Sequence, residues 1–179
     1  MVPRGERFTV AYAGSFALVL GSANTVAAIG PAASLAANGG NVSLTANAST
    51  DSTAKALPGT SGGGGGSSVG IGAAVALSIV NIATRAETLP GIALSGADDV
   101  SATASSTSAT TVKAETGASG GGVSIAPAVA IAIDNVASTV AFGFGPGFVA
   151  TGDWNGNAAT NASATTSASG DTSSSGSAA

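Results

Sequence analysis

Cysteine and histidine are both absent from the chain, and charged side chains make up only 8% of its 179 residues. Disulfides, thiolate nucleophiles and imidazole bases are therefore excluded, and so are zinc sites built on these ligands. With five Lys and Arg against nine Asp and Glu, the net charge is −4. Such a chain offers no basic surface to nucleic acid or to an anionic membrane. We expect no enzyme, no cofactor and no metal site.

Aromatic side chains are also scarce, at 4% of the chain, whereas Ala, Val and Ile dominate its 44% hydrophobic content. Small side chains of this kind pack closely. The 27 glycines and the abundant Ser and Thr would indicate disorder if the sequence were aperiodic. The apolar runs are interrupted by Gly, Ser and Asn before they reach the roughly 20 residues of a membrane span. We therefore expect no membrane insertion.

One segment of the sequence recurs, which argues against disorder. Residues 74–83 return 54 positions later as residues 128–137, and a looser copy, residues 16–20, lies 59 positions before residues 75–79. A repeated unit of this kind buries its apolar face by stacking on its neighbours. We divide the single domain, 1–179, into repeats at approximately 7–66, 67–122 and 123–179.

The first residues have two interpretations. Charged residues at Arg4, Glu6 and Arg7, followed by the uncharged run 8–20, superficially resemble a secretory signal. The alternative, which we favour, is a first and imperfect repeat, because its large residues fall where those of the second copy fall.

Within each copy, large aliphatic residues alternate with small ones. In the second copy Ile71, Val75 and Leu77 alternate with Gly, Ala and Ser, and residues 123–133 and 8–20 keep the same phase. Strict alternation and β-branched residues indicate β-strands. We predict that the large aliphatic face forms the core. The Ala/Ser face is then either exposed or pressed against another flat sheet.

Turn residues divide each copy further. Asn24, Asn81 and Asn135 suit a turn, and Pro-Gly pairs mark corners at 89–91 and 145–147. Alternating polar strands follow, and glycine-rich segments close the first two copies. The polar strands are predicted at 42–48, 100–105 and 157–168, and the glycine-rich corners at 61–66 and 117–122.

The charged residues suggest how many coils the chain makes. Arg85 and Glu87 have the same spacing as Lys113 and Glu115, which lie 28 positions further on, and Lys55 lies 30 positions before Arg85. If each coil takes about 28 residues, the three cations form a ladder on strands roughly 4.8 Å apart. The alternative is that scattered exposed cations mimic a ladder. With the ladder, the fold is all-β, a parallel β-solenoid (β-helix) of about six rungs, two to each repeat.

The two ends of such a stack expose open strand edges, which proteins normally protect. The polar segment 171–177 is unsuited to cover an apolar rung. We therefore expect either a piece of a longer solenoid or a subunit that stacks on copies of itself.

The order of these segments resembles a known family. A glycine-rich corner, the alternating strand 69–81 with its final Asn, and then a Val-Ser-x-x-Ala strand are similar to repeats of filamentous-haemagglutinin-like and leukotoxin-like filamentous adhesins. These are very large exported bacterial proteins, and the resemblance covers 62–144 well. It implies a parallel β-solenoid, an extracellular or cell-surface location and an adhesive or matrix role. The uncapped ends predict copies of the chain itself as partners, stacked end to end or side to side, and we also expect host or matrix glycans as partners.

The chain contains few residues that suggest a chemical site. Asp98 and Asp99 suit either Ca²⁺ or, more simply, a solvated turn. Asp153, Trp154 and Asn155 form either a sugar platform or a corner anchored by the single Trp. Asp134 most simply satisfies turn backbone. Polysaccharide-cleaving β-helices need two carboxylates at a defined separation, and the sequence shows no acidic cluster of that kind.

Two classes of function follow. The leading hypothesis is a structural protein, a shaft segment or self-stacking subunit of a bacterial surface fibre or adhesin. The alternative is a surface-binding module, for carbohydrate through the Trp154 corner or for ice through flat rows such as Thr103, Ser105, Thr107 and Thr111. Ice binding requires that alternation to recur in register, and we expect that strands 42–48 and 157–168 do not repeat it.

Overall fold

The computed structural model describes residues 9–57, 64–66, 68–145 and 147–174, and this part of the chain is all-β without a helix. It therefore contains no helix long and apolar enough to cross a membrane. The strands are β1 (Val10–Ile29), β2 (Ser34–Ala56), β3 (Gly64–Gly66), β4 (Val69–Thr88), β5 (Ala93–Gly120), β6 (Val123–Ile125), β7 (Ala128–Phe142) and β8 (Trp154–Ser174).

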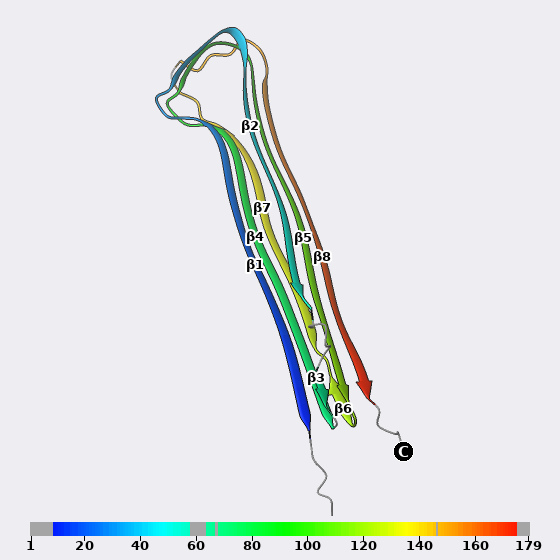
Figure 1. Ribbon diagram of the computed structural model, residues 1–179. Helices are drawn as coiled ribbons and strands as arrows, with labels where there is room; N and C mark the ends of the chain where they lie inside the picture. The colour runs from blue at the N-terminus through cyan, green and yellow to red at the C-terminus, as the bar shows by residue number, and fades with distance from the viewer. Residues whose placement is uncertain (1–8, 58–63, 67, 146, 175–179) are drawn as a thin grey trace, which may run out of the picture.

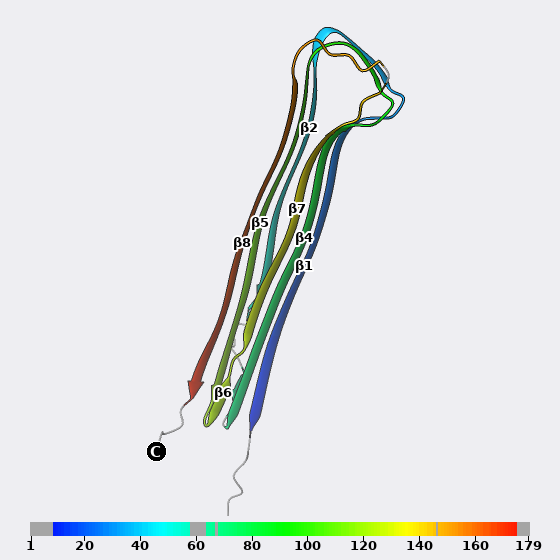
Figure 2. The ribbon, with the colours of Figure 1, turned by 180° about the vertical axis from the view of Figure 1, so that it is seen from behind.

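The strands form two sheets in which every strand pair is parallel. Sheet A contains β1, β4, β6 and β7, and sheet B contains β2, β5, β3 and β8. Figures 1 and 2 show an elongated molecule in which the two sheets lie face to face and meet at corners at one end. The chain runs along sheet A, turns at a corner and returns along sheet B. The predicted parallel all-β class is confirmed, and the arrangement is compatible with a β-solenoid.

The register of the strands measures the length of one coil. Val10 pairs with Val69, and Val69 pairs with Val123, so successive passes through sheet A lie 59 and 54 residues apart. The expected rungs of 28 residues are therefore wrong. A spacing of 28 residues carries the chain from one sheet into the other, because a single strand is already 20 to 28 residues long in β4 and β5.

The asparagines predicted at turns lie within strands instead. Asn81 lies inside β4, paired with Ser22 on one side and Asn135 on the other. The Asn135 amide Nδ2 donates a 3.4 Å hydrogen bond to Asn81 Oδ1. This ladder of neighbouring strands outweighs the turn preference of the asparagine side chain. The real corner follows Thr88, at the predicted Pro-Gly pair, where Gly91 has a φ of 86°.

The glycine-rich corners are described only in part. Strand β5 continues through the predicted corner to Gly120, and the chain reverses at residues 121–122. Of the predicted corner 61–66, residues 61–63 lie outside the described residues, and Gly64–Gly66 pair with β5 as β3.

The core is the reverse of the one predicted from the sequence. In β4 the small residues Ala74, Ala76 and Ser78 are fully buried between the sheets. Their large neighbours Ile71 and Val75 face outward and are each 36% exposed. The same holds in β1 and β7, where the large residues point away from sheet B. The Ala/Ser face is therefore the inner face of sheet A, and the large aliphatic face is its outer face.

Close contact between the sheets explains this orientation. A Cβ added to Gly72 would lie 2.6 Å from Thr116 Oγ1 and still closer to the carbonyl oxygen of Gly117 in sheet B. A Cβ on Gly120 would lie 2.8 Å from the backbone nitrogen of Gly70. Where the sheets come this close, a larger side chain would push them apart, so small residues are required there.

Hydroxyl groups line the middle of this narrow interior and join the two sheets. Ser52 and Ser78 lie 2.7 Å apart between their Oγ atoms, and Ser106 Oγ donates to Thr84 Oγ1 at 2.8 Å. Buried polar groups of this kind need partners, and here each sheet supplies the partner of the other. The register of one sheet against the other is thereby specified.

Asp134 also belongs to this interior rather than to a turn. Its carboxylate accepts hydrogen bonds from Thr110 Oγ1 at 2.8 Å and from Ser108 Oγ at 3.4 Å. The predicted role in satisfying turn backbone is therefore replaced by a link between β7 and β5.

The two largest fully buried side chains, Ile92 and Leu94, lie at the corner end of the molecule, whereas the smaller Val80 and Val112 are buried further along the strands. Ile92, Leu94 and Val100 are at most 1% exposed, and Phe142 and Phe148 pack against Leu94 and Val100. The corner is therefore the part of the fold that resembles an ordinary hydrophobic core.

Candidate functional surfaces

The functional candidates among the described residues are extended surfaces. No group of three or more acidic side chains that could hold a metal ion occurs in the described part of the chain. A hollow of about 240 Å³ lies over Ser22, Asn24, Asn81 and Asn135 on the outer face of sheet A. Ligand pockets for small molecules are usually larger and more enclosed, about 300–1,000 Å³. The outer faces and the edges of the sheets are therefore the candidates.

The first candidate is a large apolar surface on the outer face of sheet A. Strand pairing places outward residues in transverse rows, such as Leu18 beside Leu77 and Leu77 beside Ile131. We call the set of outward residues the apolar band. It comprises Val10, Tyr12, Phe16, Leu18 and Leu20 of β1, Val69, Ile71, Val75, Leu77 and Ile79 of β4, and Val123, Ile125, Val129, Ile131 and Ile133 of β6 and β7.

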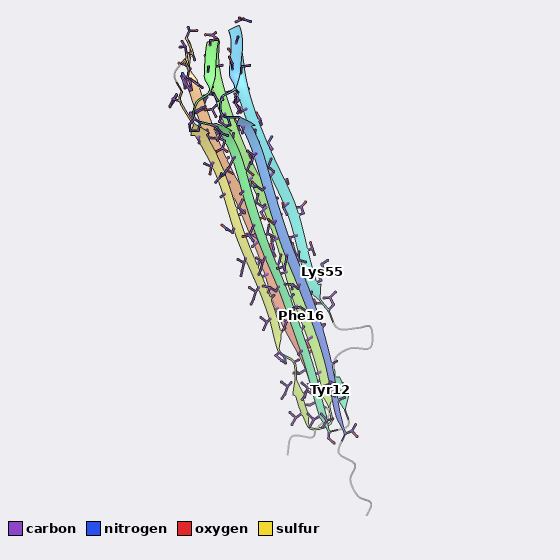
Figure 3. The ribbon with its side chains drawn as sticks, turned by 90° about the vertical axis from the view of Figure 1, so that its left-hand side faces the viewer. Tyr12, Phe16 and Lys55 are labelled. Carbon is purple, nitrogen blue, oxygen red and sulfur yellow. The ribbon has the colours of Figure 1, made fainter. Side chains whose placement is uncertain are left out.

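Exposure within the apolar band is high. Tyr12 is 86% exposed, Phe16 69% and Leu20 68%, and Ile131 in β7 is 44% exposed. Figure 3 looks onto this side of the molecule, with Tyr12 and Phe16 labelled on β1. Contiguous apolar patches of this extent are rare on soluble monomers and mark interaction surfaces.

Polar residues end the apolar band on the corner side. The next row is Ser22, Asn81 and Asn135, and two rows further on Arg85 lies between Val26 and Thr139. Within 10–20, 69–79 and 123–133 the sequence has no charged residue. The band is therefore a bounded surface rather than a general property of sheet A.

The second candidate is the polar outer face of sheet B. Thr103 lies between Thr45 and Asn157, and Thr111 lies between Thr53 and Thr165. Hydroxyl and amide side chains thus recur in register across three strands. The Thr/Ser alternation itself is not repeated in strands 42–48 and 157–168, as expected, because Ser105 lies between Asn47 and Ala159 and Thr103 has Asn157 as one neighbour.

Trp154 lies at the corner among phenylalanine rings. Its ring centroid is 4.5 Å from that of Phe148, 5.3 Å from Phe144 and 5.5 Å from Phe142. Trp154 is 37% exposed and Phe144 66%. The ring therefore contributes to the packing of the corner and keeps part of its surface accessible to solvent.

The neighbours of Trp154 in sequence have separate roles. The Asp153 carbonyl oxygen accepts from the Val100 amide at 2.9 Å, and the Asp153 amide donates to Asp99 Oδ1, also at 2.9 Å. Asn155 pairs with Ser101 on the outer face of sheet B. Since Trp154 pairs with buried Val100, the ring and Asn155 point to opposite faces of the strand.

Asp98 and Asp99 bind backbone and neighbouring side chains at the same corner. The Asp99 amide donates to Asn41 Oδ1 at 3.1 Å, and the Asn41 amide Nδ2 donates to Asp99 Oδ2 at 3.4 Å. Thr151 Oγ1 lies 3.5 Å from Asp98 Oδ1. These contacts join successive coils, and both residues lie within β5 rather than in a solvated turn.

The three cations of the expected ladder do not stack together. Lys55 pairs with Lys113 in sheet B, whereas Arg85 lies in sheet A. The ladder is therefore wrong as a set of three, and only its lysine pair is in register. Lys113 Nζ forms an ion pair with Glu115 Oε1. Glu87 lies in sheet A beside Ala28 and Ala141.

The open edges of the sheets are a third candidate. Among the described strands, β1 and β2 are each paired on one side only, as are β7 and β8. The Thr9 carbonyl accepts from the Val69 amide of β4 and the Ile29 carbonyl from the Leu89 amide just after β4, so the odd-numbered residues of β1 point their backbone groups toward β4. The even-numbered residues then point their N–H and C=O groups to the open side. Such rows are templates for a further strand.

Comparison with known proteins adds nothing to this geometry, since no family model, no curated protein and no solved structure matches the chain. The sequence alone does not reveal the outer apolar band as a surface. The alternation identifies its residues as one face of the strands but predicts that this face forms the core.

Proposed function

We propose that the chain is a self-stacking structural unit, a shaft segment or subunit of an extracellular bacterial fibre or adhesin built as a β-solenoid. The supporting observation is the pair of open parallel edges, β1 and β2 on one side and β7 and β8 on the other. A second copy placed against β7 and β8 through its own β1 and β2 would continue both sheets. Contacts of this head-to-tail kind extend without closing.

The internal rows indicate how the side chains would match across such a junction. Inside the chain Leu18 lies beside Leu77, and Leu77 beside Ile131. At the junction Ile131 of one copy would lie beside Leu18 of the next, which continues the same row. In sheet B, Thr165 would in the same way meet Thr53, and each backbone group at the edge would gain a partner.

Electron microscopy of the purified chain, with sedimentation velocity at rising concentration, tests end-to-end stacking. We expect rods whose length grows with concentration. The double variant Ala132→Pro and Ala162→Pro removes one N–H from the open side of β7 and one from that of β8. Proline there obstructs a new strand while sparing the internal ladder, so growth should stop.

The control for this experiment is the thermal unfolding of the double variant, which should remain close to that of the wild-type chain. Compact monomers of the wild type at every concentration would contradict the proposed fibre function. So would a folded double variant that still forms rods of wild-type length.

A second candidate function, surface binding through sheet B, is favoured by the rows of Thr, Ser and Asn. Flat and regularly spaced hydroxyl groups such as those of Thr53, Thr111 and Thr165 suit ordered water or a polysaccharide surface. Inhibition of ice recrystallisation by the wild type, lost in Thr111→Lys, would support ice binding. Quenching of Trp154 fluorescence by glycans would support binding at the corner instead.

A further inference from the structure

We infer that the apolar band on the outer face of sheet A is the interface for a second copy of this chain, packed face to face. This pairing is separate from end-to-end stacking, because it uses the face of sheet A and leaves the edges of β1 and β7 untouched. It would convert a two-layered plate into a four-layered one.

The first argument is the size of the surface. The apolar band is three strands wide and eleven residues long, about 36 Å at roughly 3.3 Å per residue. Twelve of its fifteen side chains are exposed, from 36% at Ile71 to 86% at Tyr12, and Val69, Leu77 and Ile79 are half-buried. Together they present on the order of 1,000 Å² of accessible apolar surface. A standard interface buries about 800 Å² on each partner. The area therefore suffices for a stable pair.

The second argument is the asymmetry of the molecule. The outer face of sheet B carries hydroxyl and amide side chains, whereas the outer face of sheet A carries fifteen apolar ones in its band. When two copies pair through sheet A, both polar faces point to water and both apolar bands are covered. Two sheets in such contact pack about 10 Å apart with interdigitated side chains.

The third argument concerns charge and favours a copy of the chain over a lipid surface. The apolar band has no charged residue, so a second band meets it without burying a charge. Peripheral helices that lie on membranes usually carry Lys and Arg beside their apolar face. Here Lys55 and Lys113 lie on the other sheet, Arg85 on sheet A lies beyond the band with Glu87 two residues on, and the net charge of the chain is −4. These features do not favour an anionic bilayer.

The test places three positive charges on one row of either face. The face variant carries Leu18→Lys, Leu77→Lys and Ile131→Lys, which are neighbours in register on sheet A. The matched control carries Thr45→Lys, Thr103→Lys and Asn157→Lys, a single row on sheet B. Both add the same charge at exposed or half-buried outward positions. Leu77→Asn is a milder single variant for use if the triple variant does not fold.

Sedimentation equilibrium should give paired molecules for the wild type and the control, with the face variants dissociated. Since pairing would have to desolvate the new charges, we expect the dissociation constant of the triple variant to rise at least about 100-fold. End-to-end stacking should survive in Leu77→Asn, as rods of single width, because β4 is the central strand of sheet A and does not meet the junction. Failure of pairing and failure of stacking can therefore be told apart.

Three results would overturn the face-to-face pairing. The first is a wild-type chain whose rods or monomers never pair at any concentration. The second is equal dissociation of the face variant and the control, which would indicate a general effect of charge. The third is a wild-type chain that stays unpaired but binds phosphatidylcholine vesicles, while the face variant does not bind them. That result would mean that a lipid surface, not a second copy, covers the apolar band.

Discussion

Ser52 of sheet B and Ser78 of sheet A form a hydrogen bond across the interior, with their Oγ atoms 2.7 Å apart. Ser78 is fully buried and Ser52 is 6% exposed. Between two sheets lined mainly by alanine and glycine, this contact aligns one sheet against the other. It is one of a series, with Thr84 and Ser106 forming the next.

Removal of one hydroxyl from this pair should lower the unfolding free energy more than removal of both. Ser78→Ala leaves the buried Ser52 hydroxyl without its partner, which costs about 1–3 kcal/mol. The double variant Ser52→Ala, Ser78→Ala removes the orphaned group and should recover much of that loss. Urea unfolding of both single variants and the double variant gives the coupling energy. Ser49→Ala, at an exposed position of β2, should change stability by less than about 0.5 kcal/mol. Additive losses would contradict the coupling.

Glycine at position 72 should be required by the approach of sheet B. Gly72→Ala would place a Cβ 2.6 Å from Thr116 Oγ1 and against the backbone of Gly117. We expect a loss of about 1–3 kcal/mol in unfolding free energy. Gly14→Ala on β1 is the matched control. Its Cβ would face outward, with the Ala73 carbonyl oxygen 3.9 Å away as its nearest neighbour outside the adjacent residues. That variant should be neutral or slightly stabilising. Equal losses in both variants would show that sheet contact is not the cause.

Much of the strand architecture could be predicted from the sequence. The alternation around Val75 identified a strand, and the offsets of 59 and 54 residues matched Phe16 and Val129 to it, the partners found in sheet A. The Pro90 and Gly91 corner was also predictable, because only a few residue types suit that turn.

The orientation of sheet A could not be predicted, for a physical reason. Alternation with a period of two residues shows that a strand has two different faces, but it does not show which face is buried. The prediction that Leu77 lies in the core and Ser78 outside assumes that the chain buries its own large residues. In the structure, contact between the sheets through glycine and alanine determines which face lies inside. The partners of Ser78 and Thr84 lie in the other sheet, at sequence separations that no local pattern reveals. The 28-residue spacing of Arg85 and Lys113 joins different sheets and is a coincidence.

Removal of the Ser15 hydroxyl should stabilise the chain. Ser15 Oγ is a buried oxygen without a hydrogen-bond partner in the described residues, on the inner side of β1 beside Ala74. Burial of an unpaired hydroxyl costs about 1–3 kcal/mol, so Ser15→Ala should raise the unfolding free energy by about 1 kcal/mol. Chemical denaturation measures this change. The same substitution at Ser22, an exposed position of β1, should have little effect. A destabilised Ser15→Ala would mean that the hydroxyl has a partner, such as an ordered water.

The pairing of Lys55 with Lys113 should be mildly unfavourable and correctable. The two lysines are neighbours in register on the outer face of sheet B, and Glu115 forms an ion pair with Lys113. Like charges directly opposite each other are destabilising, whereas opposite charges contribute roughly 0.2–1 kcal/mol. Lys55→Glu should therefore raise the melting temperature by about 1–3 °C at low salt. The gain should shrink in 1 M salt, where charges are screened beyond about 3 Å. Lys55→Gln separates the two causes, since it removes the repulsion without adding an attraction and should give a smaller rise. A melting temperature unchanged by both substitutions would contradict an electrostatic contact between these strands.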